Sequence, residues 1–297
     1  MFEEIPSGKR KAATICAILL GLLFLVSGAW KVLSPFQAGE LLEQAQVPAG
    51  WGVLGAMSLG TVELFAAFLL FLPRFRRWGG LLGSALMIFF MLWIGYYYQV
   101  LVGRECSCFP IIKRAVGPAF FLEDGVMLLL GVLAYVWSPQ VRSLRVPAIV
   151  FAALAVLAGA SFGANAFERG KLQVPVPITV DGKPQNLAEG KVLLFFYDPS
   201  CMHCDAAARF MGKLNWGGTK IVAIPTVNPQ WAGSFLHDTH LKAGTSLELD
   251  KLKKAFPFVD PPFGVALVDG LRKESFGQAR FTPPQPEAEL KKLGFVQ

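Results

Sequence analysis

The first half of the chain consists largely of long apolar runs, and this pattern ends near residue 166. Five runs stand out, at 12–30, 51–72, 78–102, 116–137 and 146–166. A helix needs about 20 apolar residues to cross a hydrocarbon layer of roughly 30 Å, and each run has about that length. Residues 1–166 are therefore predicted to form a membrane domain with five transmembrane helices.

After Phe167 the apolar runs become short and alternate with helix-forming stretches. The runs 192–197, 221–225, 263–270 and 272–276 have the length of strands, and helices are expected over 205–214 and 286–294. Strands that alternate with helices indicate a layered α/β domain. Residues 167–297 are predicted to form this second domain.

The basic residues in the connections predict the orientation of the helices. The chain has 54% hydrophobic and 16% charged residues and a net charge of +7. Basic residues are more numerous on one side of the predicted membrane domain, where they are Lys9, Arg10, Lys11, Arg74, Arg76, Arg77, Arg142 and Arg145. Because cytoplasmic loops retain Lys and Arg, the N-terminus is predicted to be cytoplasmic, in a bacterial inner membrane. The same pattern accounts for most of the positive charge, so membrane lipid is an expected partner and nucleic acid is not.

Five crossings place everything after Ala166 on the outer, periplasmic side of the membrane. The loop between the third and fourth runs lies on that side as well, so two pairs of cysteines share one compartment. A cleaved signal peptide at residues 1–30 is the alternative, because basic residues precede the first run. It would remove one helix without changing the sidedness of the rest.

The first pair, Cys201 and Cys204, forms a CxxC motif between a predicted strand and a predicted helix. A cysteine at a helix N-terminus meets unpaired backbone N–H groups and the positive end of the helix dipole, which lower its pKa. Cys201 has this position, and His203 can add positive charge beside it. Cys204 lies about one turn deeper and can close a disulfide with Cys201. The motif therefore predicts a redox-active pair.

A structural disulfide and half of a zinc site are the alternatives for the CxxC motif. A closed zinc site needs about four ligands. The chain has no second CxxC motif, and His237 and His240 are the only histidines besides His203. These two histidines are expected on a solvated helix or loop, and no metal site is expected.

The second pair, Cys106 and Cys108, lies in the loop between the third and fourth apolar runs. One residue separates the two cysteines, so a disulfide between them needs a tight turn and is strained, and strain raises the reduction potential. Such a disulfide would accept electrons from the CxxC dithiol. The alternative is that both cysteines are merely apolar loop residues. Cys16 stands alone in the first run and is interpreted as a small side chain that packs between helices.

Acidic residues inside the apolar runs form a further candidate site. Glu63 lies in the second run, and Glu123 and Asp124 lie in the fourth. A charge at the centre of a bilayer costs roughly 2.5 to 3.5 kcal/mol, so such acids face the protein interior or the surface. A polar site at Glu63 and Asp124 and a structural pairing, for instance of Glu63 with Lys31, both remain open. A membrane quinone is the natural acceptor for electrons that leave the cysteines, although the sequence shows no cofactor site.

The second domain resembles the thioredoxin-like fold of the TlpA and DsbA type. The resemblance rests on the order strand, CxxC, helix and strand, followed by a proline directly before a late strand in "DPPFGVALVDG", and it covers about residues 172–297. It implies that Pro262 is the cis-proline of that fold. Of the two residues between the cysteines, His203 resembles the histidine found there in the oxidising periplasmic members, whereas Met202 stands in place of their usual proline.

The first domain resembles the MauE/DoxX family of membrane proteins over about residues 12–137. The resemblance rests on "LLGLLFLVSGAWKVLSP", on the "CSCF" loop and on the acid-bearing fourth run, with Pro110 where the family pattern has glycine. It implies a core of four membrane helices, to which residues 146–166 add a fifth.

The chain is therefore expected to be a membrane-anchored thiol-disulfide oxidoreductase that acts on thiols or disulfides of extracytoplasmic proteins. In this interpretation, Cys201 attacks or is attacked to form a mixed disulfide, and Cys204 resolves that disulfide. Cys106 and Cys108 then accept the electrons. An accessory subunit of a larger membrane complex, with structural cysteines, is the first alternative. A soft-metal carrier that uses the two cysteine pairs as thiolate ligands is the second.

Overall fold

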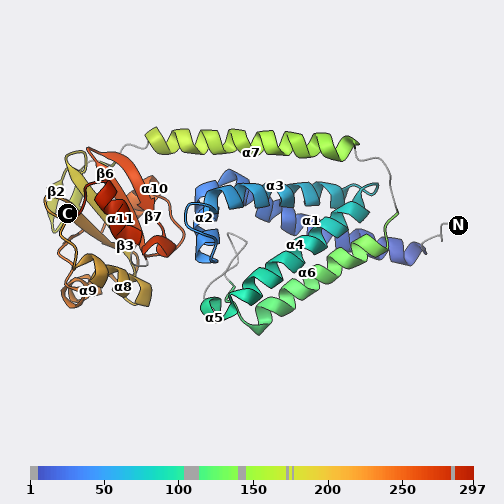
Figure 1. Cartoon of the computed structure of the whole chain (residues 1–297), viewed down its shortest axis with the longest axis horizontal. Helices are drawn as coiled ribbons and strands as arrows, with labels where there is room; N and C mark the ends of the chain where they lie inside the picture. Colours follow the sequence, from blue (N-terminus) through green and yellow to red (C-terminus); the bar gives the residue numbers. More distant parts are fainter. Residues whose placement is uncertain (1–5, 104–113, 140–144, 172–173, 176, 282–284) are drawn as a thin grey trace. The chain divides into compact units, whose positions relative to one another are not determined.

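The computed structural model describes residues 6–103, 114–139, 145–171, 174–175, 177–281 and 285–297 (Figure 1). The chain divides into two compact units, Met1–Asn165 and Ala166–Gln297. We refer to them as the membrane unit and the α/β unit.

The regular elements in the described part of the membrane unit are helices, which short connections join. Its helices are α1 (Ser7–Leu33), α2 (Pro35–Gln44), α3 (Gly52–Phe71), α4 (Arg76–Tyr96), α5 (Tyr98–Leu101), α6 (Pro118–Val136) and α7 (Arg145–Lys171), the last of which continues into the α/β unit. Five of these described helices, α1, α3, α4, α6 and α7, are long and apolar enough to cross a membrane. The five predicted spans are thus confirmed.

Two details of the membrane unit differ from the sequence prediction. The predicted helix over 78–102 is divided into α4 and the short α5. The ten-residue α2 was not predicted, because its mixed apolar and polar sequence is too short and too polar for a membrane span. Pro35 is its first residue, a position where the missing N–H costs no hydrogen bond.

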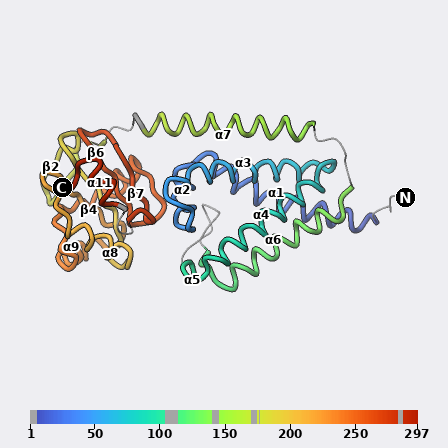
Figure 2. Tube along the Cα trace, in the orientation of Figure 1, coloured from blue at the N-terminus to red at the C-terminus, as the bar shows by residue number. Residues whose placement is uncertain are grey.

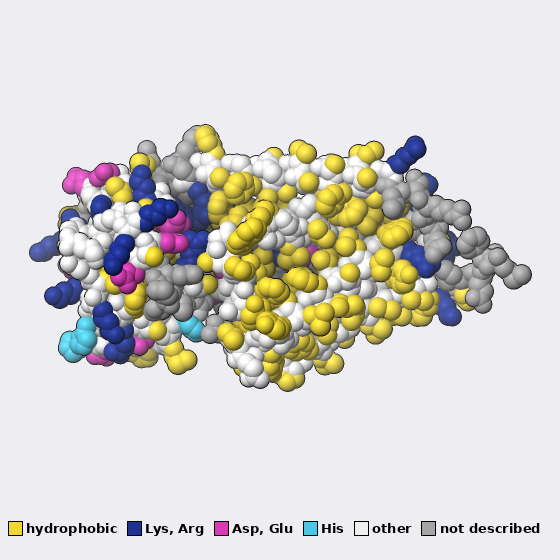
Figure 3. All heavy atoms as spheres, in the orientation of Figure 1, with side chains coloured by type: hydrophobic (Ala, Val, Ile, Leu, Met, Phe, Trp, Pro, Cys, Tyr) yellow, Lys and Arg dark blue, Asp and Glu magenta, His cyan; other side chains and the backbone are white. Residues whose placement is uncertain are grey.

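The outer surface of the membrane unit is apolar. On the face shown in Figure 3, hydrophobic side chains cover the helices of this unit. Large apolar residues such as Leu92, Leu122 and Ile149 are more than two-thirds exposed. Lipid, rather than water, is the solvent in which such a surface is stable, so the membrane unit is the part that lies in the bilayer.

Small residues let the helices of the membrane unit approach one another closely. A Cβ atom built at Gly28 of α1 would lie 2.8 Å from the carbonyl oxygen of Gly60 in α3. A Cβ atom at Gly80 of α4 would lie 2.8 Å from the carbonyl oxygen of Gly131 in α6. Close backbone approach is the usual means of packing helices in lipid, where apolar burial alone supplies little driving force.

Helix α7 contacts the end of α1 through polar side chains. Ser161 donates a hydrogen bond to the carbonyl oxygen of Val32 (2.7 Å), and the side-chain amide of Asn165 donates one to that of Leu33 (3.2 Å). The last carbonyl oxygens of a helix have no donor within it, so Ser161 and Asn165 supply donors to acceptors that would otherwise stay unpaired in the membrane.

The α/β unit contains a five-stranded mixed sheet. Its elements, in chain order, are β1 (Ile178–Val180), β2 (Lys183–Gln185), β3 (Lys191–Tyr197), α8 (Met202–Met211), β4 (Lys220–Pro225), η1 (Pro229–Trp231), α9 (Ala232–Thr239), β5 (Gly244–Thr245), α10 (Leu249–Ala255), β6 (Phe263–Val268), β7 (Leu271–Phe276), η2 (Gln278–Phe281) and α11 (Gln285–Lys292). The strand order is β5-β4-β3-β6-β7, and β1 and β2 form a separate hairpin. Strand β3 pairs parallel to β4 and antiparallel to β6, with Phe195 opposite Ala223 and Gly264.

Both faces of this sheet are covered. Leu193, Phe195 and Tyr197 of β3 belong to a core with α8, α9 and the C-terminal residues. Val192, Leu194 and Phe196 alternate with them and belong to a second core around α10 and the β1–β2 hairpin. A strand buried on both faces needs a continuous apolar run, which is why 192–197 could be recognised. Helices α8 and α9 lie side by side in Figure 2 and pack in the same core.

This arrangement confirms the predicted fold class, a membrane α-helical bundle followed by an α/β domain with thioredoxin-like strand order. The peptide bond between Pro261 and Pro262, directly before β6, is cis. The elements that the sequence analysis missed are short or amphipathic, namely β1, β2, β5, α9 and α10.

Candidate active site around Cys201 and Cys204

The CxxC motif lies where β3 ends and α8 begins. Cys201 is the N-cap residue of α8, with φ −91° and ψ 122°, and α8 starts at Met202. Asp198 shapes the connection: its carbonyl oxygen accepts a hydrogen bond from the Cys201 N–H (3.1 Å), and its carboxylate accepts one from the Ser200 N–H (2.7 Å). Asp, Pro and Ser are residues that favour such turns.

The two cysteines have different surroundings. Cys201 is half-buried, whereas Cys204 is 0% exposed and belongs to the core between the sheet and α8. The Cys204 sulfur accepts a hydrogen bond from the Asp198 N–H at 3.3 Å. Both thiols are free, so the structure describes the reduced pair. A partner sulfur can therefore reach Cys201 but not Cys204.

The Cys201 thiol is strongly acidic. Its pKa is lowered to about 5, first because the Cys204 thiol donates a hydrogen bond to it, and further because of the backbone N–H groups of Cys204 and His203 and the His203 side chain; burial acts in the opposite direction. The backbone N–H groups at the helix terminus thus lower the pKa of Cys201, and His203 lowers it through hydrogen bonds rather than through the positive charge that the sequence analysis considered. The larger contribution of Cys204 is a property of the folded pair.

The Cys204 thiol has the opposite character. Its pKa is raised, first because the thiol is the donor in the hydrogen bond to Cys201 and second because it is buried. At neutral pH the pair therefore carries one negative charge, on the Cys201 sulfur, and one proton, on the Cys204 sulfur. This is the charge state that a nucleophilic cysteine and its resolving partner need.

Tyr197, which sequence reasoning missed, lies beside Cys204. It is completely buried, stacks on Phe235 of α9 with ring centroids 4.4 Å apart, and has a hydroxyl without a hydrogen-bond partner among the described residues. Burial first, and the electrostatic effect of the neighbouring Cys204 second, raise the pKa of Tyr197 to about 12. The sequence signal that could have identified Tyr197 as a site residue is its position at the end of the buried strand, four residues before Cys201.

Apolar side chains are exposed in the segments that follow β3 and β4. Met202 is 82% exposed, Trp231 is 51% exposed and Val227 is 45% exposed. The N–H of Thr226 donates a hydrogen bond to the carbonyl oxygen of Tyr197 (2.8 Å), which joins the ends of the two strands. These exposed residues therefore lie at the same edge of the sheet as Cys201.

Cys106 and Cys108 lie outside the described residues. The residues that flank their segment are described. The N–H of Gly103 donates a hydrogen bond to the carbonyl oxygen of Val116 (2.9 Å), so the chain returns to the same place after the segment. The neighbouring Arg114 donates hydrogen bonds to Asp124 (3.1 Å) and Glu123 (3.0 Å) of α6.

The predicted intramembrane acids are both ion-paired. The Lys31 ammonium group lies 3.0 and 2.8 Å from the two carboxylate oxygens of Glu63 and also donates to the Ser27 hydroxyl. The Lys31 and Glu63 side chains are 3% and 2% exposed. Asp124 is buried against Arg114. The structural pairing that the sequence analysis left open for Glu63 is therefore present.

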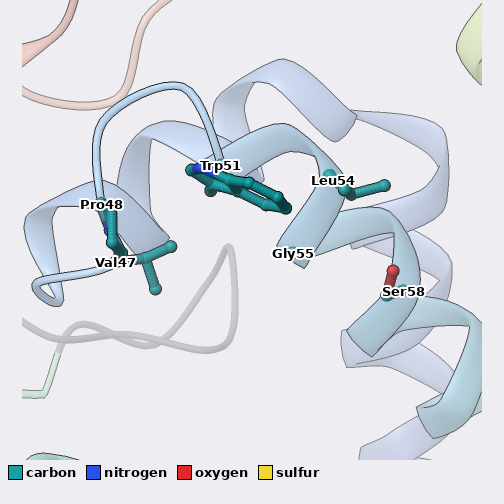
Figure 4. Close-up of a pocket in the computed structure, with 6 residues that line it drawn as sticks. All are labelled: Val47, Pro48, Trp51, Leu54, Gly55 and Ser58. Carbon is teal, nitrogen blue, oxygen red and sulfur yellow. The ribbon is translucent and has the colours of Figure 1, made fainter.

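Other candidate groups lie apart from one another. His237 is exposed beside Asp238 near the end of α9, and His240 caps that helix. In the described part of the chain, no three His, Cys, Asp or Glu side chains gather as metal ligands would. A cavity of about 400 Å³ at the start of α3 has an apolar lining without a titratable group; its residues are Val47, Pro48, Trp51, Leu54, Gly55 and Ser58 (Figure 4).

A protein-family model matches the first part of the chain. Residues 9–138 match the model of the family described as methylamine utilisation protein MauE. No curated protein matches the chain.

Solved structures match the second part. A secreted disulfide oxidoreductase of Mycobacterium tuberculosis is 19% identical, with 37% of this chain and 85% of that chain covered and a TM-score of 0.32. The thioredoxin domain of a thiol-disulfide oxidoreductase from Bacteroides vulgatus is 11% identical, with 41% and 94% covered and a TM-score of 0.32. The Xanthomonas campestris bacterioferritin comigratory protein is 14% identical, with 41% and 94% covered and a TM-score of 0.36.

The chain is thus a membrane protein whose residues 9–138 match the MauE family model and whose C-terminal unit has a thioredoxin-like arrangement with a CxxC motif at the start of α8.

Proposed function

We propose that this protein is a membrane-anchored thiol-disulfide oxidoreductase. The observation that carries the proposal is the contrast between the two sulfurs of the CxxC motif. Cys201 is accessible and has a pKa of about 5, whereas Cys204 is buried and protonated one helical turn away. A structural disulfide has no need of an acidic, accessible thiol.

The chemistry follows from this contrast. In the oxidising direction, a thiolate of the partner protein attacks Cys201 of the Cys201–Cys204 disulfide, a mixed disulfide forms, and Cys204 leaves with the electron pair. A second partner thiolate then attacks the partner sulfur of the mixed disulfide, which forms the partner's disulfide and releases Cys201 as a thiolate. Two electrons pass from the partner's dithiol to the CxxC pair.

The low pKa of Cys201 favours this direction. A stabilised thiolate stabilises the reduced pair, which raises its reduction potential and makes its disulfide a stronger oxidant. We therefore assign thiols of extracytoplasmic proteins as the substrates. The electrons would pass on to Cys106 and Cys108, whose strained disulfide would be a stronger oxidant still, and then to a membrane quinone.

The proposed location is the bacterial inner membrane, with the N-terminus in the cytoplasm and the α/β unit outside. It rests on the distribution of Lys and Arg between the connections and on the five membrane-spanning helices. This location puts both cysteine pairs in an oxidising compartment, where a disulfide relay can operate.

The test is to trap the intermediate between the two pairs. In the full-length protein, Cys204→Ser removes the resolving thiol, so a mixed disulfide between Cys201 and Cys106 or Cys108 should accumulate. Mass spectrometry after acid digestion without reductant would show the cross-linked peptide. Cys201→Ser is the matched control and should show none.

The relay would be contradicted if the Cys204→Ser variant contained only free or glutathione-capped Cys201 beside an intact Cys106–Cys108 disulfide. The quinone step is tested separately. The reduced protein in lipid vesicles should regain its disulfides faster with ubiquinone than without it, and equal rates would remove quinone from the scheme.

A further inference from the structure

The end of the membrane unit where α1 and α4 begin contains a buried arginine. Arg76, the first residue of α4, is only 7% exposed. Its Nη1 donates a hydrogen bond to the Thr14 hydroxyl of α1 (2.8 Å), and its Nε donates one to the carbonyl oxygen of Leu70 in α3 (3.3 Å). The guanidinium group is therefore held in one place by two neighbouring helices.

Both acceptors are neutral, and they use only part of this guanidinium group. A guanidinium group has more N–H donors than these two bonds need. The donors on Nη2 have no hydrogen-bond partner among the described residues. Nη2 is also not sealed inside the protein. A ligand can therefore reach Arg76 from outside.

Two further cations of the membrane unit that are largely buried have carboxylate partners. Lys31 lies 2.8 Å from Glu63, and Arg114 lies 3.1 Å from Asp124. Burying a charge is costly unless an opposite charge and hydrogen bonds compensate it. No carboxylate among the described residues pairs with Arg76. A counter-charge for Arg76 must therefore come from a bound anion.

The surroundings of Arg76 are basic as well. The Thr14 hydroxyl also donates to the carbonyl oxygen of Arg10 (2.9 Å), so the first turns of α1 lie beside Arg76. The charge of Arg10 is near enough to act on the Arg76 guanidinium group. The first turns of α1 and α4 contain no acidic residue that could offset the positive ends of the helix dipoles. On the face shown in Figure 3, basic side chains gather at this end of the membrane unit.

We infer that Arg76 and Arg10 bind the phosphate group of an anionic phospholipid. Phosphate oxygens accept strong, charge-assisted hydrogen bonds from guanidinium N–H groups, and basic sites between membrane helices suit such headgroups. The ligand is a lipid rather than free phosphate because Arg76 begins a membrane-spanning helix. Trp78 and Leu81, in the first two turns of this helix, are exposed, so acyl chains can lie along α4 while the headgroup meets Arg76.

A purely structural role of Arg76 would have a different consequence. Its bonds to Thr14 and Leu70 hold α1 and α3 against the start of α4 whether or not a lipid is bound. Arg76→Gln would then lower the unfolding temperature by the same amount with and without lipid. The affinity for the lipid, and the rise in unfolding temperature that the lipid causes, separate the two roles.

The experiment uses the full-length protein, purified free of lipid in an uncharged detergent. It is titrated with phosphatidylglycerol, or with phosphatidylcholine of the same acyl chains, whose choline group compensates the phosphate charge. Native mass spectrometry counts the bound lipid molecules and gives the dissociation constant, and the unfolding temperature is followed in the same titration. Arg74→Gln is the matched control, because it removes the same charge from the same connection but Arg74 is exposed.

We expect one phosphatidylglycerol to bind with an affinity that Arg76→Gln weakens about tenfold or more, because a charged hydrogen-bond donor is lost. Arg74→Gln should weaken it less than about twofold, since an exposed charge is screened. The rise in unfolding temperature with phosphatidylglycerol should shrink in Arg76→Gln and persist in Arg74→Gln. Equal weakening by the two substitutions would show only a general effect of positive charge and would overturn the inference.

A measurement on the unchanged protein does not depend on how Arg76→Gln folds. Phosphatidylglycerol should bind at least about tenfold more tightly than phosphatidylcholine, because only the first has an uncompensated charge. Inorganic phosphate at the same concentration should neither displace phosphatidylglycerol nor raise the unfolding temperature. Equal affinity for the two lipids overturns the inference, and so does inorganic phosphate that binds as tightly as phosphatidylglycerol.

Discussion

At the scale of single residues, two ionisable side chains, Cys201 and Glu63, each depend on one neighbouring side chain. The acidity of Cys201 depends first on Cys204, and Glu63 lies in the membrane unit against Lys31. In both cases the neighbour is distant in sequence or one helical turn away, and the effect is lost when that neighbour is changed.

The titration of Cys201 is the first prediction at this scale. In a background with Cys16, Cys106 and Cys108 changed to Ser, alkylation by iodoacetamide should have a midpoint near pH 5, because the pKa of Cys201 is about 5. Cys204→Ala should raise this midpoint more than His203→Ala, because the Cys204 hydrogen bond is the larger cause. A midpoint near the roughly 8.5 of a free thiol would contradict the prediction.

The same pKa makes the stability of the reduced protein depend on pH. Because the pKa of Cys201 is lowered on folding, its stabilising effect is complete above the pKa of the unfolded thiol and is lost as the pH falls through about 5. The difference in unfolding temperature between the reduced protein and Cys201→Ser should therefore grow from pH 5 to pH 8. A difference that stays constant would show that the thiolate is not stabilised by the fold.

The buried ion pair of the membrane unit allows a third prediction. Lys31→Met or Glu63→Gln alone leaves a charge buried without its partner, which typically costs about 3–5 kcal/mol. Lys31→Met combined with Glu63→Leu removes both charges and should recover most of the loss. The free energy of unfolding in mixed detergent micelles measures the effect.

The exposed pair of Lys291 and Glu287 is the control, since such a pair contributes about 0.3–0.5 kcal/mol. If the single variants at Lys31 and Glu63 lowered the free energy of unfolding as little as Lys291→Met does, the prediction for a buried ion pair would be contradicted.

At the scale of elements, glycines decide how closely the membrane helices pack. Gly28→Ala should destabilise the membrane unit by about 1–3 kcal/mol, because its Cβ would lie 2.8 Å from the carbonyl oxygen of Gly60. Gly125→Ala, in α6 with no atom within 4 Å of a Cβ, should be tolerated or stabilising. Unfolding in mixed micelles compares the two, and equal effects would show that the α1–α3 contact is not tight.

At the scale of the whole molecule, the prediction concerns sidedness. Intact cells treated with a membrane-impermeant maleimide should show labelling of reduced Cys201 but not of a cysteine introduced as Arg76→Cys. This outcome is expected because the positive-inside distribution predicts that Arg76 is cytoplasmic, and five spans would then put the α/β unit outside. Labelling of the introduced cysteine, with Cys201 protected, would reverse the orientation.

The sequence by itself determined the features that follow from local pattern. Long apolar runs required helices in lipid, and the run 192–197 required a strand buried on both faces, because no other placement removes these residues from water. The CxxC spacing placed Cys201 at a helix N-terminus for the same local reason. Short or amphipathic elements such as α2, α10 and β5 were missed, since their hydrophobic patterns are too short to be distinguished from those of loops.

Only the tertiary structure decided how groups distant in sequence meet. The pairing of Lys31 with Glu63 depends on the close α1–α3 crossing, and the burial of Cys204 depends on α8 packing against Tyr197 and Phe235. The pKa of a group is set by what surrounds it in space, so the sequence could name Cys201 as acidic but could not show that Cys204 is the larger cause. The bond from the Asp198 N–H to the Cys204 sulfur likewise exists only because the turn after β3 folds back onto the first turn of α8.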